Sequence, residues 1–447
     1  MSSDPHIVNA LRAELSDRDL WQTRAVVLTF GILSGLTVVS FTWLTEQAIE
    51  HFEQARAGAA WLPLLWMPLC TAAVVWTTRR WAPGAAGSGI PQVMAALQPG
   101  VEPGDRGLFV SVRLTLAKML LTAAGLLGGL SQGREGPSVQ IGAGIMHAAR
   151  RFLPARSAVS EQGLLIAGGA AGIAAAFNTP LGGIMFAIEE LSRRPEQRSN
   201  GLIMAAIVLA GLMGVSVYGN STYFGVIRVQ PVSWALLGPG LLVALGCGLL
   251  GGLFARLLAR SLSGRSDDRF MRWRQRYPIR FAAGCGLAVA VIGLVSGGAT
   301  FGSGYAHTRE LLEGGGGSGE IGGLYLLLKF AATWITAWSG APGGIFAPAL
   351  AIGGALGGDV AQLSHFDAPT LIALGMAGFL AAVTQAPMTA FIIVMEMVDG
   401  YQLVLSLMTC AMIASGISRL VSRPLYANLT DLQLARLPVP LRSGVQH

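Results

Sequence analysis

Arg134 and Glu135 are charged residues in a setting where charge is rare. They belong to the stretch GREGP at residues 133–137, which follows an apolar run from Leu108 to Leu130 and precedes another apolar stretch at 141–149. A carboxylate at the centre of a membrane-spanning helix costs roughly 2.5–3.5 kcal/mol on insertion scales, so an acid inside a membrane is a candidate functional group. Such a group can carry a proton, and in its charged form it can occupy the position of an anion.

Two further stretches are built like GREGP: GSGIP at 87–91 and GIFAP at 344–348. In all three, a proline stands where the first turn of a helix would lie, and its missing N–H costs nothing there. The preceding glycines let the backbone turn and let a ligand approach closely. A helix that begins inside a membrane directs unpaired N–H groups and the positive end of its dipole at the space in front of it. An anion satisfies both, so the three motifs together predict an anion site.

Neutral amides would form most of this site, so an anion can bind weakly enough to leave again. Ser88 adds a hydroxyl donor, although a serine at this position could equally serve as a simple helix cap. The Glu135 carboxylate could occupy the site as a tethered competitor and swing away once protonated, which would make it both a gate and a proton carrier. The alternative is that Glu135 only pairs with Arg134 or caps its own helix.

The composition predicts a polytopic α-helical membrane protein. Only 12% of the 447 residues are charged and 52% are hydrophobic, whereas soluble domains carry about 25% charged residues. Apolar runs close to the roughly 20 residues that span a bilayer recur along the chain. Besides the run at 108–130, these are Val26–Leu44, Leu62–Trp76, Leu202–Val217, Leu236–Leu258 and Leu403–Ile417.

Other classes of function find little support. The net charge of +7 and the arginine-rich stretch from Arg256 to Arg280 are typical of a cytoplasmic loop under the positive-inside rule, not of nucleic-acid binding. The four cysteines lack CxxC spacing, so neither a disulfide nor a metal site is predicted. His147 and His307 have no HExxH context, so we expect no enzyme, resident metal or cofactor.

The chain contains two copies of one unit. Its only lysines, Lys118 and Lys329, are 211 residues apart, and each precedes by fifteen residues the glycine that opens GREGP or GIFAP. The prolines of these two motifs keep the same spacing. A second stretch repeats with a spacing of 207 residues and aligns Glu189 with Glu396.

The two copies are predicted to insert into the membrane in opposite senses. In the first copy, basic residues at 193, 194 and 198 follow Glu190, whereas the matching stretch of the second copy, MVDGYQL, has none. Conversely, the loop at 46–56 of the first copy is acidic, and its counterpart in the second copy is the arginine-rich stretch. The basic side therefore alternates between equivalent loops, as in inverted-repeat transporters, whose sites lie near the bilayer midplane. Within a single transmembrane domain we place the first repeat at 24–218 and the second at 234–421, flanked by an N-terminal surface helix (1–23) and a short C-terminal helix and tail (422–447).

Glu189 and Glu190 stand side by side near the basic end of their helix. Because Glu189 has a counterpart in Glu396, we predict a structural role that both copies share. Glu190 aligns with Met397 instead. An acid required by one copy only is the better candidate for an asymmetric task, such as passing protons in from the cytoplasm. The alternative is a solvated helix end.

The motifs GSGIP, GREGP and GGIFAP, in this order, together with the tyrosine of SRPLY, resemble the CLC family of chloride channels and chloride/proton antiporters. The resemblance extends from about Thr23 to Leu434. It implies an all-α fold with an inverted repeat of tilted and partly spanning helices, assembled as a homodimer with one pore per subunit. It also implies a multi-pass protein of the cell membrane with both termini in the cytoplasm. Because 21 residues follow Tyr426, we expect no C-terminal CBS domains.

The resemblance further implies two anion sites. The hydroxyl groups of Ser88 and Tyr426 would hold a central anion together with two backbone amides, and Glu135 would compete for an outer site made of amides alone. The residues that would supply these amides are Arg134, Glu135, Gly136, Ile345, Phe346 and Ala347.

Proton transfer and selectivity also follow from the resemblance. Glu190 matches the internal proton-transferring glutamate of the family's exchangers, a position that channel members commonly fill with valine. Lys118 matches a buried lysine that assists electrostatically, whereas Lys329 receives no role beyond packing or snorkelling. Ser88 favours chloride, because nitrate-preferring relatives carry proline there. The predicted function is chloride/proton antiport, and a passive gated chloride channel without proton coupling is the alternative.

Overall fold

The computed structural model describes residues 15–192, 200–219, 224, 234–264, 268–313 and 322–435. Three of the sequence-based predictions fall wholly or partly outside these residues. They are the N-terminal surface helix up to residue 14, the basic stretch at 193–198 and the C-terminal tail after residue 435.

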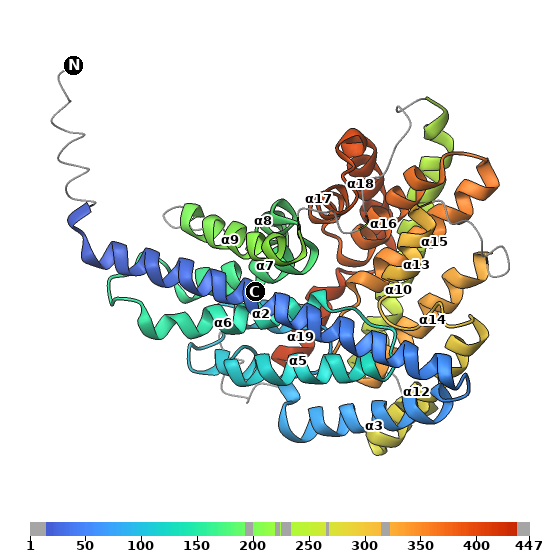
Figure 1. The fold of residues 1–447 in the computed structure, drawn as a ribbon, viewed down its shortest axis with the longest axis horizontal. Coiled ribbons are helices and arrows are strands. Elements are labelled where there is room, and N and C mark those ends of the chain that lie inside the picture. Colours follow the sequence, from blue (N-terminus) through green and yellow to red (C-terminus); the bar gives the residue numbers. More distant parts are fainter. Residues whose placement is uncertain are drawn as a thin grey trace.

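The described residues are folded into helices of very different lengths (Figure 1). The first half contains α2 (Arg18–Gly58), α3 (Pro63–Trp81), α4 (Ile90–Ala96), α5 (Val112–Leu127), α6 (Glu135–Ala148), α7 (Glu161–Phe177), α8 (Pro180–Phe186), the π-helical turn η4 (Ala187–Leu191) and α9 (Asn200–Tyr218). The second half contains α10 (Leu237–Ser263), α11 (Arg269–Arg276), α12 (Pro278–Val295), α13 (Tyr305–Leu312), α14 (Gly322–Ser339), α15 (Phe346–Ser364), α16 (Ala368–Thr384), α17 (Pro387–Met397) and α18 (Val404–Val421), and α19 (Leu425–Leu434) follows.

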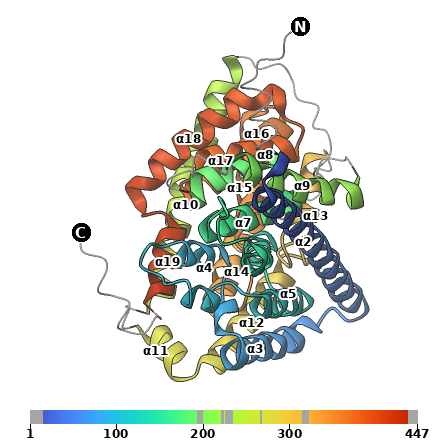
Figure 2. The ribbon, with the colours of Figure 1, turned by 90° about the vertical axis from the view of Figure 1, so that its left-hand side faces the viewer.

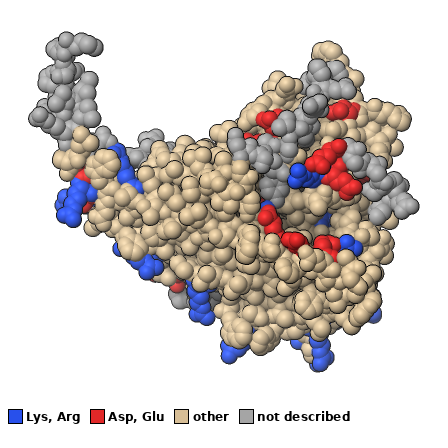
Figure 3. Space-filling view, in the orientation of Figure 1, with Lys and Arg blue, Asp and Glu red and all other residues tan. Residues whose placement is uncertain are grey.

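Within the described ranges, seven helical segments are long and apolar enough to cross a membrane. They lie in α2, α5 with its preceding turn, α9, α10, α12, α15 and α18. The space-filling view shows wide uncharged areas between the charged groups, as expected of a surface in contact with lipid (Figure 3). The chain is therefore a multi-pass helical membrane protein, as its composition predicts.

The two halves repeat the same order of helices. α2 to α9 correspond in sequence to α10 and α12 to α18, with α11 inserted, and equivalent neighbours pack in both halves: α6 against α7 and α15 against α16, or α2 against α9 and α10 against α18. Equivalent helices of the two repeats also pack against each other, most extensively α3 with α12 and α8 with α17. In Figure 2 the partners of each pair lie side by side, α8 and α17 in the upper part of the view and α3 and α12 near its bottom. The pairs mark the axis that relates the two repeats.

Glycines allow the closest helix contacts in both repeats. A Cβ atom added at Gly142 of α6 would collide with the carbonyl of Gly168 in α7, and one added at Gly353 of α15 would collide with the carbonyl of Gly375 in α16. Small residues at helix crossings are the usual means of close packing in membranes. Close packing against α7 and α16 thus fixes the positions of α6 and α15.

The helix α2 is longer than the sequence patterns indicate. It forms one continuous helix of 41 residues, and the Asp17 side chain caps its first turn by accepting a hydrogen bond from the Leu20 amide at 3.0 Å. Residues 18–23 are therefore the first turns of this helix. No proline interrupts the stretch, and its glycines at 31 and 35 face Ala206 and Ala210 of α9, so tertiary packing supports the helix there.

Candidate functional site

Three helices begin at the centre of the molecule, at the positions that the proline motifs predict. α6 begins at Glu135 and α15 at Phe346, and two backbone hydrogen bonds between Gly133 and Gly344 hold their starting loops together. α4 begins at Ile90, after Gly89 with a φ of 110°, a backbone conformation that glycine adopts most readily. The unpaired N–H groups of these helix ends therefore gather in one region.

Ser88 lies directly against this region. A Cβ atom added at Gly136 would collide with the Ser88 hydroxyl oxygen, and one added at Gly344 would lie 3.0 Å from the Gly136 nitrogen. The loop of α4 thus reaches the starts of α6 and α15. Any side chain at residue 136 would fill the space in front of the hydroxyl group.

Tyr426 completes the same region from α19, which packs against α4. Its side chain is fully buried and its hydroxyl faces that of Ser88, which is 8% exposed. Neither hydroxyl completes a hydrogen bond with the described part of the chain. Buried hydroxyl groups are normally paired, so these two donors are available to a ligand such as an anion.

Glu135 is fully buried and carries the only carboxyl group among the predicted anion-site residues. Its Oε1 accepts a hydrogen bond of 2.5 Å from the Tyr305 hydroxyl, and the backbone N–H groups of Glu135 and Ala347 face the same carboxylate. Oε2 completes no hydrogen bond within the described residues. The carboxylate therefore lies at the amides that were predicted to form the outer anion site.

Arg134 extends away from the start of α6 towards α2. Its guanidinium forms an ion pair of 2.9 Å with Glu46 and lies 3.4 Å from the Thr42 carbonyl and the Thr45 hydroxyl. This arrangement gives the arginine its own acidic partner. Sequence analysis found neither Glu46 nor Tyr305, because both lie far from the GREGP motif along the chain.

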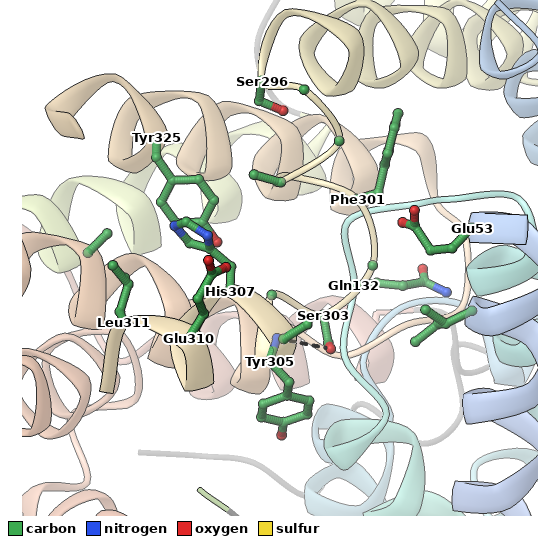
Figure 4. Close-up of a pocket in the computed structure, with 18 of the residues that line it drawn as sticks. Glu53, Gln132, Ser296, Phe301, Ser303, Tyr305, His307, Glu310, Leu311 and Tyr325 are labelled. Carbon is green, nitrogen blue, oxygen red and sulfur yellow. Dashed lines mark hydrogen bonds between the residues drawn. The ribbon is translucent and has the colours of Figure 1, made fainter. Parts of the chain in front are cut away.

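Two cavities approach the site from different directions, and their linings share no residue. The larger one, which we call the outer cavity, has a volume of about 770 Å³ and is lined in part by Arg134. Tyr305 also belongs to its lining (Figure 4). The inner cavity, of about 280 Å³, reaches Ser88 and Ile345 and is also lined by Arg274. The buried Glu135 lies between the two groups of lining residues.

The outer cavity is rich in carboxylates. Figure 3 shows acidic side chains gathered around a hollow on one side of the molecule and basic ones mainly along another edge. Arg56, Arg134 and His307 also line the cavity. Its carboxylates are Glu46, Glu50, Glu53, Glu310 and Asp359.

Lys118 and Lys329 are both fully buried and make equivalent contacts. Lys118 Nζ donates hydrogen bonds to the carbonyls of Ala85 and Gly87, at 2.8 and 2.5 Å, in the loop that carries Ser88. Lys329 Nζ donates to the carbonyls of residues 300 and 302, at 3.0 and 2.8 Å, in the loop before α13. Sequence analysis gave Lys329 no such role, although the repeat of the letters GSG at 87–89 and 302–304 was a usable signal.

Glu189 and Glu396 accept backbone hydrogen bonds across the repeat interface. Glu189 accepts from Met388 and Thr389 at the start of α17, and Glu396 accepts from Leu181 and Gly182 at the start of α8. Both carboxylates thus satisfy helix N-termini of the other repeat. The shared structural role predicted for the pair is confirmed.

Glu190 has a different environment from its neighbour. It is half-buried in the π-helical turn η4, and its charge is close enough to Tyr426 to interact with it electrostatically. Glu190 therefore lies in the neighbourhood of Tyr426. Among the described residues, no group of three or more His, Cys, Asp or Glu side chains is arranged to hold a metal ion.

An inverted helical repeat with a polar site buried at its centre defines an ion-transport protein of the membrane. The chain belongs to the voltage gated chloride channel family, whose sequence profile it matches over residues 70–419. Curated relatives include the H(+)/Cl(−) exchange transporter ClcA of Citrobacter koseri, 31% identical over 96% of this chain and 94% of the relative. The protein of the same name from Salmonella typhimurium is 31% identical over 91% of this chain and 87% of its own.

Solved structures share the fold. A slow cyanobacterial Cl−/H+ antiporter superposes with a TM-score of 0.81 at 25% identity, covering 93% of this chain and 98% of its own. A CLC-type fluoride/proton antiporter superposes with a TM-score of 0.75 at 23% identity, covering 92% of this chain and 98% of its own. The inverted-repeat fold expected from the sequence is therefore confirmed.

Proposed function

We propose that this protein exchanges chloride for protons across the cell membrane. The observation that carries the proposal is the position of Glu135: its carboxylate lies at the amides that begin α6 and α15, between one cavity that reaches Tyr305 and another that reaches Ser88. A charged carboxylate there excludes a chloride ion from the same amides. Protonation removes the charge, so an anion can take its place while the proton travels with the side chain.

Chloride ions and protons reach the site through different residues. Chloride from the inner cavity binds between the hydroxyls of Ser88 and Tyr426 and the amides of Ile345 and Phe346, and then moves to the amides of Gly136 and Ala347. Protons from the inner side reach Glu135 by way of Glu190, whose half-buried carboxyl is near Tyr426. Lys118 supports the central site by fixing the loop of Ser88. The exchange transporters of C. koseri and S. typhimurium support this assignment by their similarity.

The orientation follows the distribution of basic residues. Arg274 lines the inner cavity, and Arg269, Arg272 and Arg276 belong to the same helix, α11. Under the positive-inside rule this side faces the cytoplasm, and we expect both chain termini on the same side. The acidic outer cavity then opens to the exterior.

The protein forms a homodimer through α9 and α18. Both helices expose large apolar side chains, at Leu212 and Val217 in α9 and at Leu405, Met412 and Leu420 in α18. α8 and α17 pack beside them. Mass determination in lipid nanodiscs should give twice the chain mass. A monomer that transports at full rate would show that transport does not require the dimer.

The decisive experiment uses purified protein in sealed liposomes under an outward chloride gradient, with a potassium ionophore clamping the voltage near zero. External pH is recorded with no proton gradient imposed. Protons driven uphill by chloride establish exchange, and Glu135→Gln should abolish this movement while chloride continues to flow. Chloride flux without proton movement in the unmodified protein would instead identify a passive channel.

A further inference from the structure

Tyr305 forms a contact with Glu135 that no motif indicates. Its hydroxyl donates a hydrogen bond of 2.5 Å to Oε1 of a carboxylate that is 170 residues away in the sequence. Tyr305 is the first residue of α13, and Figure 4 shows its ring pointing away from the cluster of Tyr325, His307 and Glu310 on the same side of the outer cavity. The hydroxyl therefore reaches from the cavity lining to the buried gate.

The ring of Tyr305 is held from two sides. The Phe224 ring lies 5.6 Å from it, and the Arg134 guanidinium lies over its face at 5.9 Å. A guanidinium over an aromatic face attracts it. Arg134 itself is anchored by Glu46, so the tyrosine ring is oriented by contacts additional to its hydrogen bond with Glu135.

The loop before Tyr305 is built like the loop of Ser88. The letters GSG recur at 302–304, 215 residues after 87–89, and each loop is fixed through two carbonyl groups by its own buried lysine. The first loop presents the Ser88 hydroxyl to the central site. The second presents Tyr305 to the gate, so Lys329 acts as a positioning residue through this loop.

We propose that Tyr305 is a positioning residue that holds the charged Glu135 carboxylate over the outer anion site and thereby sets how readily the gate is released. The proposal rests on the function assigned above to Glu135. A hydrogen bond to an ionised acceptor is roughly twice as strong as one between neutral groups. The tyrosine O–H therefore stabilises the blocking, deprotonated gate more than the protonated gate that must move away.

Several other charged or titratable groups adjoin Glu135 or line the outer cavity, and a test must leave them unchanged. Arg134 is the neighbour of Glu135 in the sequence, and Glu46 of α2 pairs with Arg134. Tyr426 of α19 is close enough to Glu135 to interact with it electrostatically. The outer cavity adds His307, Glu50, Glu53, Glu310 and Asp359. Replacing Tyr305 by phenylalanine removes one hydroxyl and retains all of these groups.

The test compares Tyr305→Phe with Tyr325→Phe in proteoliposomes, by chloride efflux measured from pH 4 to pH 8. Tyr325 is a matched control, because it lines the same cavity and its buried hydroxyl completes no hydrogen bond with described residues. Loss of a hydrogen bond to a charged group should make Tyr305→Phe about tenfold faster near neutral pH and move its pH–rate profile about one pH unit upward. Tyr325→Phe should follow the unmodified protein.

A profile for Tyr305→Phe that coincides with the unmodified one, or an equal shift in Tyr325→Phe, overturns the proposal. If Tyr305→Phe is too unstable to reconstitute, 3-fluorotyrosine at residue 305 provides the opposite test. Its more acidic phenol is a stronger donor, so below pH 7 transport should be slower and the profile should move downward. An unchanged or faster rate would contradict the proposed hydrogen bond.

The Glu135→Gln background separates this proposal from the proposed function. There, adding Tyr305→Phe should leave the pH profile unchanged, because no carboxylate remains to be held. If Glu135→Gln still couples protons to chloride, the function assigned to Glu135 fails. If Glu135→Gln is uncoupled but Tyr305→Phe alone behaves like the unmodified protein, only the role of Tyr305 fails. If Tyr305→Phe shifts the pH–rate profile equally with and without the Glu135 carboxyl group, the Tyr305 hydroxyl acts on a group other than Glu135.

Discussion

Gly133 and Gly344 exchange two backbone hydrogen bonds across the centre of the molecule. The Gly133 amide donates to the Gly344 carbonyl at 2.7 Å, and the Gly344 amide donates back to the Gly133 carbonyl at 2.8 Å. The two glycines are 211 residues apart and occupy equivalent places in the two repeats. Because α6 and α15 begin directly after them, the two helix ends that face the proposed anion site are fixed to each other.

This pairing makes Gly344 sensitive to any side chain. A Cβ atom there would lie 3.0 Å from the Gly136 nitrogen and 3.1 Å from both the Gly133 carbonyl oxygen and Pro137 Cδ. We expect Gly344→Ala to separate the two loops and to weaken chloride binding about tenfold, since overpacking typically costs about 1–3 kcal/mol. Isothermal titration with chloride measures the effect. Gly238→Ala in α10, where a Cβ atom meets nothing within 4 Å, is the control; equal affinities in both variants would contradict this reasoning.

The hydroxyls of Ser88 and Tyr426 should contribute directly to chloride affinity. A hydrogen bond to a charged group is worth about 1.5–3 kcal/mol, so Ser88→Ala and Tyr426→Phe should each bind chloride roughly ten- to a hundredfold more weakly. Ser415→Ala is a matched control, because this α18 hydroxyl is also buried and completes no hydrogen bond with described residues. If all three variants bind equally well, the two hydroxyls do not contact the ion.

The two buried lysines should differ in their effect on chloride, although their contacts are alike. Lys118→Met frees the carbonyls of Ala85 and Gly87 and so loosens the loop of Ser88. We expect chloride affinity to fall several-fold. Lys329→Met loosens the loop before Tyr305, which contacts the gate and not the central site, so affinity should stay the same. Both variants are measured on the Glu135→Gln background, where the gate does not compete for the site; a similar loss in both would show that the loops are not independent.

Local sequence signals located the helix starts but not the contacts made between distant segments. The prolines of the motifs at 87–91, 133–137 and 344–348 predicted that helices start there, and the structure has helices that begin at Ile90, Glu135 and Phe346. These signals suffice because proline and glycine act on the backbone within a few residues. The repeat of Glu189 in Glu396 likewise predicted a shared role from spacing alone.

The residues around Glu135 could not be predicted from local sequence signals. Tyr305 and Glu46 reach the GREGP segment only through the tertiary fold, and a tyrosine or a glutamate in an ordinary helix carries no local signal of such a contact. The continuous helix from Arg18 was also missed. Its polar first turns resemble a surface helix in sequence, whereas the absence of a helix breaker lets them continue into the apolar part.

Glu189 and Glu190 are adjacent, and their replacement by glutamine should have opposite consequences. Glu189 accepts backbone hydrogen bonds from Met388 at 3.2 Å and from Thr389 at 2.6 Å. Glutamine has one acceptor oxygen, and its NH₂ group would face the second N–H donor, which costs about 1–3 kcal/mol. We expect Glu189→Gln to lower the Tm in detergent while the ratio of protons to chloride in the surviving protein stays unchanged.

Glu190→Gln should leave the Tm near that of the unmodified protein and remove proton movement. Glutamine matches the size of the side chain but cannot take up and release a proton in this pH range, so the inner path to Glu135 is interrupted while the chloride path through Ser88 and Tyr426 remains. A chloride electrode and a pH electrode in the same liposome suspension measure both fluxes together. Proton movement that persists in Glu190→Gln, or disappears equally in Glu189→Gln, would mean that protons reach Glu135 by another route.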